Sequence, residues 1–495
     1  MSLSEKWLNL KNGSDIRGIA SEGIEGLHIN LTDDVVFNIA AGFACYAKEK
    51  LNKNDITIAI GHDSRISAPR LKKCCIDAFI KSGVTVFDCG LSTTPAMFMI
   101  TVDENYKADA SVMLTASHLP FNRNGLKFFT ADGGFEGSDI TKILEYAGKG
   151  EFDFSKQGNL KEVNYIEKYA SDIAEKIKKE TNLQKPFEGM KIAVDAGNGS
   201  GGFYAKMLTD LGADTSGSKF LEPDGNFPNH IPNPENKEAM KAISDAVLDS
   251  KSDLGIIFDT DVDRAAIVDY SGSEINKNRL IALISAVLME EKKGTIVTDS
   301  VTSAELKNFI ENNLGGTHHR FKRGYKNVIN EAIRLENEGI YAPLAIETSG
   351  HAALKENYFL DDGAYLVTRL LIKAVLMRKE SKNLTDLISE LKDPEFETGY
   401  RLNLLNKDFK PDGEKILEEL KQAVEKAEGF SLETPNYEGV RVNVENGWFL
   451  LRLSLHEPLM PLDIQGNTVE AMNKMKAFIK EFLSDFDCID SSAIK

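Results

Sequence analysis

The feature that most constrains the fold is a repeated alternation of apolar runs and amphipathic stretches. An apolar run at residues 57–60 ends in polar turn residues, and a helical pattern follows over residues 69–82. The same order returns at residues 191–211 and again at residues 295–313. Buried parallel strands are continuous apolar runs that alternate with helices. The sequence therefore predicts three α/β units of similar build.

The pattern changes after about residue 379. Residues 440–444 and 448–452 alternate between apolar and polar side chains, and a final helical pattern covers residues 469–484. These features predict a smaller α+β domain with a partly antiparallel sheet. We therefore expect four domains: α/β domains over residues 1–159, 160–271 and 272–379, and an α+β domain over residues 380–495. No low-complexity linker separates them, so we expect them to pack around a shared cleft.

Charge and hydropathy exclude several classes of partner. The 495 residues carry a net charge of −17, which repels nucleic acids and anionic membranes but not a small phosphorylated ligand. The longest apolar run, residues 280–289, is about half of what a membrane span needs. The start has no signal-peptide pattern, and the five cysteines are odd in number and not in metal-ligand spacing. We expect a cytoplasmic protein without a nucleic-acid or membrane partner.

A serine lies at the end of a predicted strand. Residues 111–114 form a short apolar run, and residues 115–120, which include Ser117 and His118, turn sharply into Pro120. Residues 126–129 predict a second strand that returns Lys127 beside the first. Ser117 is a candidate nucleophile, because loops at strand ends hold reactive groups on a rigid base. A turn or helix-capping serine is the competing interpretation.

Three carboxylates directly follow another apolar run. Asp259, Asp261 and Asp263 stand at alternate positions, so an extended segment would turn all three to one side. Oxygen ligands without nearby His or Cys indicate Mg²⁺ over zinc. An EF-hand loop would need glycine and glutamate where this chain has Arg264 and Tyr270. A solvated acidic turn remains the alternative.

Two further strand-end loops carry polar side chains. Glu347, Ser349 and His351 follow an apolar run and could bind the hydroxyls of a sugar, although a structural turn is equally consistent. In the last domain, Arg452, Ser454 and His456 stand within five residues of one another. A guanidinium, a hydroxyl and backbone N–H groups could form a phosphate cradle there, although a histidine is more often a surface residue.

Taken together, these motifs resemble the α-D-phosphohexomutase superfamily, most closely its phosphomannomutase/phosphoglucomutase branch. Six segments occur in the family's order, and the resemblance covers the whole chain: residues 15–18, 61–65, 115–118, 259–264, 347–351 and 452–458. The resemblance implies four domains around a central cleft. It also implies an isomerase that converts hexose 1-phosphate to hexose 6-phosphate and back, with glucose and/or mannose as the sugar.

The resemblance also implies roles for individual residues. Ser117 would be carried as phosphoserine and exchange its phosphoryl group through a hexose 1,6-bisphosphate, which serves as intermediate and activator. Asp259, Asp261 and Asp263, with an oxygen of the Ser117 phosphate, would hold Mg²⁺. His118, Lys127 and Arg17 would assist proton transfer or neutralise the phosphoryl group. The residues expected to bind substrate are Arg264, Lys326, Glu347, Ser349, His351, Arg452, Ser454 and His456.

Other functions remain open at this point. Within the family, a phosphoglucosamine mutase is the nearest alternative, and a sugar-phosphate sensor that has lost turnover is a non-enzymatic one. The segment Gly197–Gly202 matches the G-x-G-x-x-G pattern of dinucleotide-binding proteins, but Glu222, at the expected ribose position, lies in a turn. We expect a small-molecule sugar phosphate as the partner and a monomer or homodimer as the assembly.

Overall fold

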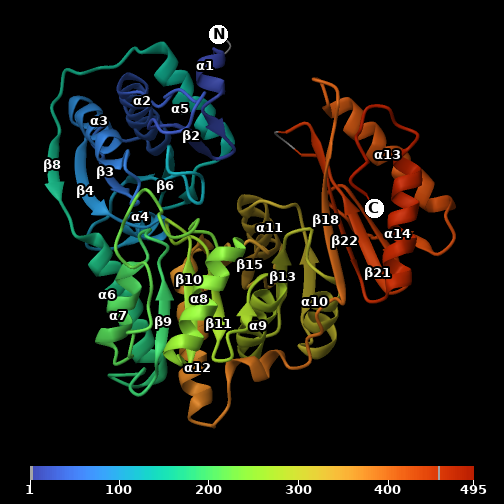
Figure 1. Cartoon of the computed structure of the whole chain (residues 1–495). Helices are drawn as coiled ribbons and strands as arrows, with labels where there is room; N and C mark the ends of the chain where they lie inside the picture. Colours follow the sequence, from blue (N-terminus) through green and yellow to red (C-terminus); the bar gives the residue numbers. More distant parts are fainter. Residues whose placement is uncertain (1–3, 455–456, 495) are drawn as a thin grey trace. The chain divides into compact units, whose positions relative to one another are not determined.

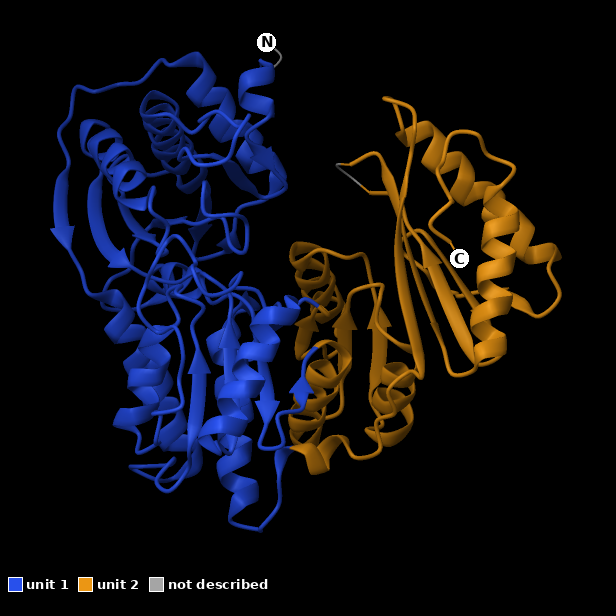
Figure 2. Ribbon diagram, viewed as in Figure 1, with its two compact units in different colours: residues 1–276, 349–384 blue, residues 277–348, 385–495 orange. Residues whose placement is uncertain are grey.

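The computed structural model describes residues 4–454 and 457–494. The chain divides into two compact units, the first of residues 1–276 and 349–384 and the second of residues 277–348 and 385–495 (Figure 2). Across the described residues, no helix combines the length and the hydropathy needed to cross a bilayer.

The first unit begins with a mixed sheet in the order β1-β2-β6-β5-β3-β4-β8, with β7 paired to β6. Strands β3, β4, β5 and β8 are parallel, whereas β6 runs antiparallel to both β5 and β2. The strands are β1 (Lys11–Asn12), β2 (Asp15–Ile19), β3 (Thr57–His62), β4 (Thr85–Leu91), β5 (Ala110–Leu114), β6 (Arg123–Thr130), β7 (Gly133–Gly134) and β8 (Asn159–Glu162).

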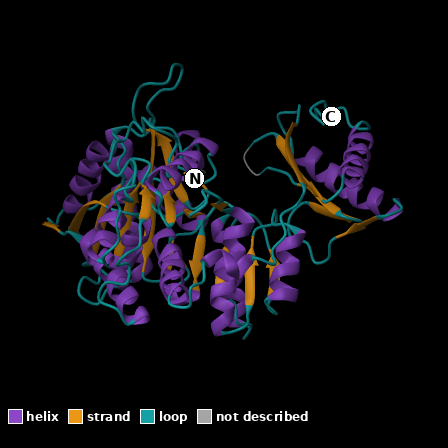
Figure 3. Ribbon diagram, turned by 60° about the horizontal axis from the view of Figure 1, so that its bottom comes forward, coloured by secondary structure: helices purple, strands orange, loops and turns teal. Residues whose placement is uncertain are grey.

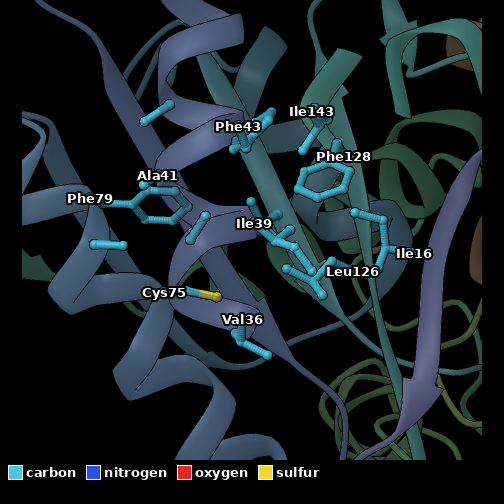
Figure 4. Close-up of a cluster of buried hydrophobic side chains, with 14 of the residues drawn as sticks. Ile16, Val36, Ile39, Ala41, Phe43, Cys75, Phe79, Leu126, Phe128 and Ile143 are labelled. Carbon is cyan, nitrogen blue, oxygen red and sulfur yellow. The ribbon is translucent and has the colours of Figure 1, made fainter. Parts of the chain in front are cut away.

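Helices cover both faces of this sheet (Figure 1). They are α1 (Glu5–Leu8), α2 (Asp33–Leu51), α3 (Ala68–Lys81), α4 (Thr94–Val102) and α5 (Gly137–Lys149). Side chains of α2, α3 and α5 form one apolar core with alternate residues of the strands, and in Figure 4 Phe43 of α2 lies between Phe79 of α3 and Phe128 of β6. The opposite face packs on α4, where Phe98 contacts Phe129 edge to face. Because β5 is buried on both faces, its end is a rigid place for a loop.

The second sheet of this unit has the order β12-β11-β10-β9, in which β9 and β10 are parallel and β10 and β11 antiparallel. Its strands are β9 (Ile192–Asp195), β10 (Leu254–Phe258), β11 (Ala265–Asp269) and β12 (Glu274–Ile275). The unit also contains a hairpin of β16 (Ala352–Leu354) and β17 (Leu360–Asp361), a 3-10 turn (Lys355–Asn357), and the helices α6 (Tyr165–Thr181), α7 (Gly202–Asp210), α8 (Lys237–Ser250) and α12 (Gly363–Arg378). Asp362 caps α12 by accepting a hydrogen bond from the Tyr365 N–H at 2.8 Å.

The second unit contains an α/β part and a sheet-rich C-terminal part, both visible in Figure 3. In the α/β part, β13 (Thr295–Thr298) lies between β14 (Thr317–Arg320) and β15 (Leu344–Ile346), all parallel. Its helices are α9 (Lys277–Glu291), α10 (Ala304–Asn308) continued by a π-helical turn (Phe309–Asn313), and α11 (Tyr325–Asn337).

The C-terminal part is an antiparallel sheet in the order β18-β22-β21-β20-β19. A short 3-10 segment (Leu384–Ile388) precedes it, and the helices α13 (Lys410–Lys426) and α14 (Val469–Leu483) share an apolar core with the sheet. The strands are β18 (Phe396–Asn403), β19 (Phe430–Leu432), β20 (Val440–Val444), β21 (Gly447–Leu451) and β22 (Leu459–Gly466). Three α/β parts followed by an α+β part agree with the order predicted from sequence.

Candidate active site

Ser117 lies in the loop between β5 and β6 of the first unit. Its backbone is left-handed, with φ of 51°, which a residue other than glycine adopts only where neighbours hold it. The Thr115 hydroxyl accepts the Ser117 N–H at 2.9 Å and donates to the Asp63 carboxylate at 2.7 Å. The loop is therefore tied to the end of β3, and Ser117 is 3% exposed.

The Arg65 side chain fixes the position of this loop through hydrogen bonds. Its guanidinium donates to the carbonyls of Ser117, Leu119 (2.7 Å), Pro120 (2.7 Å) and Arg123 (2.9 Å). It also pairs with the Asp63 carboxylate at 3.2 Å, and both side chains are fully buried. Sequence reasoning gave Arg65 no role, although it belongs to the segment 61–65 that carries the family resemblance.

The acidic segment is a turn, and the prediction of an extended segment was wrong. Val262 is left-handed, with φ of 67°, and the Asp259 N–H donates back to the Arg264 carbonyl at 3.3 Å. The turn still gathers the carboxylates, because one oxygen of each of Asp259, Asp261 and Asp263 lies within 4.8 Å of the others. The reversal of the chain, and not strand alternation, brings them together.

Residues from distant parts of the sequence surround this cluster. The Ser117 hydroxyl donates to Asp259 at 3.0 Å, and Lys127 Nζ lies 2.6 Å from Asp263 and 3.6 Å from Asp261. Arg264 Nη2 donates to the Ser117 hydroxyl at 3.0 Å and to Asp259 at 3.1 Å. The sequence motifs did not indicate Thr94, whose N–H donates to the Asp261 carbonyl at 2.9 Å and whose hydroxyl contacts the Asp261 carboxylate.

The electrostatics of the cluster fit a divalent cation. Burial and the two neighbouring carboxylates raise the pKa of Asp259 well above its ordinary value. Burial alone would also raise the pKa of Asp263, but Lys127, His351 and Arg264 outweigh it and lower that pKa. One buried oxygen of Asp261 and one of Asp263 have no hydrogen-bond partner. Buried carboxylate oxygens that repel one another and lack partners are a donor set for a hard cation.

Two histidines flank the serine and the carboxylates. His118 Nδ1 lies 3.3 Å from the Ser117 hydroxyl and accepts from Arg264 Nη2 at 2.6 Å. Burial, with the charges of Arg264 and Arg17, lowers the pKa of His118 to about 3, so this ring is neutral at pH 7. His351 contacts the Asp361 carboxylate and lies 3.9 Å from Asp263 Oδ1.

His351 carries a positive charge, in contrast to His118. Burial lowers its pKa, but Asp361 and Asp263 outweigh that effect and raise the pKa to about 9. Asp361 also accepts the Ala352 N–H at 2.9 Å, so the hairpin of β16 and β17 positions this carboxylate. The neighbouring Ser349 is 7% exposed, and its hydroxyl has no hydrogen-bond partner.

Arg17, the remaining residue predicted to be catalytic, forms an ion pair with Asp15 at 2.9 Å.

The other predicted substrate-binding residues belong to the second unit. Glu347, at the end of β15, accepts the Gly324 N–H at 2.6 Å, and Lys326 lies in the first turn of α11. Arg452 donates to Asp463 at 3.0 Å, and the Ser454 hydroxyl accepts the Glu457 N–H at 3.2 Å. His456 lies outside the described residues.

Asp299 is a further acidic residue that sequence reasoning missed. It follows β13 and is fully buried, and one of its oxygens accepts the Thr348 hydroxyl at 2.7 Å. Its other oxygen has no hydrogen-bond partner. Its position after an apolar run, in the segment Thr295–Ser300, is the signal that could have indicated it.

Family models match three consecutive segments of the chain. The phosphoglucomutase/phosphomannomutase α/β/α domains I, II and III match residues 9–153, 167–272 and 276–394. Phosphoglucomutase of Neisseria gonorrhoeae is 31% identical over 473 residues, which cover 94% of this chain and 95% of the relative. The chain belongs to the phosphoglucomutase/phosphomannomutase family.

Other relatives agree with this assignment. The phosphomannomutase/phosphoglucomutase of Pseudomonas aeruginosa is 28% identical over 97% of this chain and 95% of its own length. A solved family member from Burkholderia thailandensis has the same fold, with a TM-score of 0.79, 24% identity and 98% of both chains covered. The predicted family, its combination of three α/β domains with an α+β domain, and the predicted class of hexose-phosphate mutase, an intramolecular phosphotransferase, are confirmed.

Proposed function

We propose that this phosphohexomutase converts the 1-phosphate and 6-phosphate of glucose and/or mannose into one another through a phosphoserine at Ser117. The observation that carries this proposal is the hydroxyl of Ser117 within 3.0 Å of both Asp259 and Arg264, next to a buried acidic cluster. A hydroxyl that must hold and release a phosphoryl group needs cationic partners and a rigid loop, and both surround Ser117.

In the proposed reaction, the P–O bond to Ser117 breaks as a new P–O bond forms to a hydroxyl of the substrate. That hydroxyl loses its proton to a base, and the resulting hexose 1,6-bisphosphate returns its other phosphoryl group to Ser117. Arg264 and Lys127 would stabilise the charge on the transferring oxygens. Their contacts support this role, because Arg264 donates to the Ser117 hydroxyl and Lys127 to the Asp263 carboxylate. His118 and Arg17 complete this proposed catalytic group. His118 would act there as a neutral hydrogen-bond partner.

Mg²⁺ is the proposed metal, held by Asp259, Asp261, Asp263 and an oxygen on Ser117. When bound, it would offset negative charge on the phosphoryl oxygens. All the donors are oxygen atoms, which Mg²⁺ prefers over sulfur or nitrogen.

Substrate binding is proposed for two groups of residues. Ser349 and His351, with Glu347, would bind sugar hydroxyls that stay equivalent when the bisphosphate turns over. Arg452 and Ser454, with His456 and Lys326, would bind the phosphate that is not reacting. The four domain boundaries given above, a cytoplasmic location and a monomeric or homodimeric assembly are part of the same proposal.

Two measurements test it. Intact-mass analysis before and after incubation with glucose 1,6-bisphosphate should show a gain of one phosphoryl group, which Ser117→Ala removes. A coupled assay with glucose 1-phosphate, trace bisphosphate and Mg²⁺ should show turnover by the phosphorylated protein. Phosphorylation without turnover of glucose, mannose or glucosamine phosphates would indicate a sensor, and turnover of glucosamine phosphate alone would indicate the aminosugar enzyme.

A further inference from the structure

The glycine-rich segment Gly197–Gly202 lies directly against the acidic turn, residues 259–264. Gly199 is its second glycine, the position at which a dinucleotide-binding motif lets the backbone approach a pyrophosphate. A Cβ atom at Gly199 would lie 2.6 Å from the carbonyl oxygen of Thr260 and 2.8 Å from its Cα. The backbone of Thr260 therefore fills the space that this motif otherwise leaves for a ligand.

Thr260 stands between Asp259 and Asp261, two of the proposed cation ligands, and is fully buried. Its carbonyl accepts the Ser200 N–H at 2.8 Å. The segment thus donates a hydrogen bond to the turn at the point where it also contacts the turn's backbone. Both the contact and the bond require that Gly199 carries no side chain.

The start of α12 meets the same turn in a similar way. The Gly363 N–H donates to the Val262 carbonyl at 3.1 Å. A Cβ atom at Gly363 would lie 2.6 Å from the carbonyl carbon of Arg264 and 2.8 Å from its carbonyl oxygen. Neither Gly199 nor Gly363 has the left-handed backbone that favours glycine. Close contact, and not backbone conformation, is what excludes a side chain at these two positions.

Three consecutive carbonyls of the turn, those of residues 260–262, accept hydrogen bonds from outside it. The donors lie in three separate parts of the first unit and are the N–H groups of Ser200, Thr94 and Gly363, in that order. The turn needs such support, because its buried carboxylates repel one another. In addition, Val262 has a left-handed backbone, which persists in a β-branched residue only where neighbours hold it.

We propose that Gly199 and Gly363 are positioning residues for the cation site. They let backbone N–H groups reach the acidic turn, and those bonds hold the carboxylates at the spacing that a divalent cation needs. Mg²⁺ demands near-ideal octahedral geometry, so a turn displaced by a new methyl group would bind it more weakly. This inference rests on the metal site proposed above, and it adds two residues that supply no ligand themselves.

Isothermal titration of Mg²⁺ into the dephosphorylated protein tests these glycines. Gly199→Ala and Gly363→Ala should each raise the Kd by about tenfold or more. Gly202→Ala is the matched control, because a Cβ atom there would lie 2.5 Å from the Leu221 carbonyl oxygen, outside the acidic turn. It should lower the Tm by a similar amount and leave the Kd within about twofold. An unchanged Kd in Gly199→Ala, or an equal rise in Gly202→Ala, would overturn the proposal.

Hydrogen exchange in the unmodified protein gives a second test that does not depend on the folding of any variant. If these hydrogen bonds favour the cation-binding form of the turn, the cation must strengthen the same bonds by linkage. In NMR of the ¹⁵N-labelled protein, we expect saturating Mg²⁺ to slow exchange of the Ser200 and Gly363 amides by about tenfold. The reference is the Lys219 amide, which donates to the Val194 carbonyl at 2.8 Å. Slowing no greater than that of Lys219 would overturn the proposal.

The two tests also separate this inference from the proposed metal site. If the parent protein binds no Mg²⁺, the metal site is refuted and the inference fails with it. If the parent binds Mg²⁺ while the glycine variants keep the same Kd, the metal site stands and the positioning role alone is refuted.

Discussion

Replacing Lys127 with methionine is expected to tighten the binding of a divalent cation while it lowers catalytic activity. The Lys127 ammonium lies 2.6 Å from Asp263 and 3.6 Å from Asp261, and its side chain is 5% exposed. It therefore neutralises two of the carboxylates that would bind the cation. Removing it leaves those carboxylates to repel each other, and a bound cation relieves that repulsion.

The size of the effect follows from Coulomb's law with screening. Two unit charges about 4 Å apart interact by about 4 kcal/mol at an effective dielectric constant of about 20. Side chains and water relax around the lost charge and reduce this effect. We therefore expect the free energy of metal binding to become more favourable by about 1.4–2.8 kcal/mol. That range corresponds to a Kd about tenfold to a hundredfold lower.

Isothermal titration of Mg²⁺ into the dephosphorylated protein measures this Kd without any turnover. The increase in Tm at saturating Mg²⁺ gives a second readout and should be larger for Lys127→Met than for the parent protein. Lys127→Arg keeps the charge and is the matched control, with a Kd close to that of the parent. An unchanged or higher Kd in Lys127→Met would refute the idea that the ammonium and the cation share these carboxylates.

The activity of the same variant should change in the opposite direction. The Lys127 ammonium would stabilise the negative charge that develops on the phosphoryl oxygens during transfer. Loss of one such stabilising group typically lowers kcat by about 10²–10³. A fall in kcat with a simultaneous fall in the metal Kd separates loss of catalysis from loss of metal. If Lys127→Met instead bound Mg²⁺ more weakly and also lost activity, Lys127 would have a structural role only.

Three further outcomes are expected. Ser117→Ala should reduce kcat by several orders of magnitude in the coupled assay, and a reduction below about tenfold would contradict covalent catalysis. Arg452→Ala should mainly raise KM, because it removes binding shared by ground and transition states; a fall in kcat at unchanged KM would argue against that role. Burial lowers the pKa of His230, but its 3.0 Å pair with Asp195 outweighs this and raises the pKa above 6.5. This pair therefore stabilises the fold below about pH 6.5, and the stabilisation is lost as pH rises through the higher folded pKa. Thermal unfolding of His230→Asn should lack that part of the pH dependence, and an unchanged pH profile would exclude the pair as its cause.

The sequence alone predicted the order of the helices and strands and which polar residues follow the ends of strands. Apolar runs such as residues 254–258 are local signals, because a strand buried on both faces must be continuously apolar wherever it lies in the chain. The type and spacing of Asp259, Asp261 and Asp263 likewise predicted an oxygen-ligand site without knowledge of the fold.

Sequence reasoning led to a wrong prediction, or to none, for residues in turns and loops outside the helices and strands. The acidic segment is a turn because Val262 adopts a left-handed conformation, which propensity disfavours for a β-branched residue. The sequence around Arg65 and Thr94 does not indicate their main partners, because the carbonyl of Leu119 and the carboxylate of Asp261 lie far from them along the chain.

Side-chain types and their periodicity along the chain determined the three α/β domains, the α+β domain and the chemical classes of the site, since burial and ligand preference depend on residue type. Tertiary structure alone decided that Ser117 lies 3.0 Å from Asp259, 142 residues away, and that His118 is neutral while His351 is charged. The physical reason is that hydrogen bonds and electrostatic fields act across space, over a few ångströms, whatever the separation along the chain.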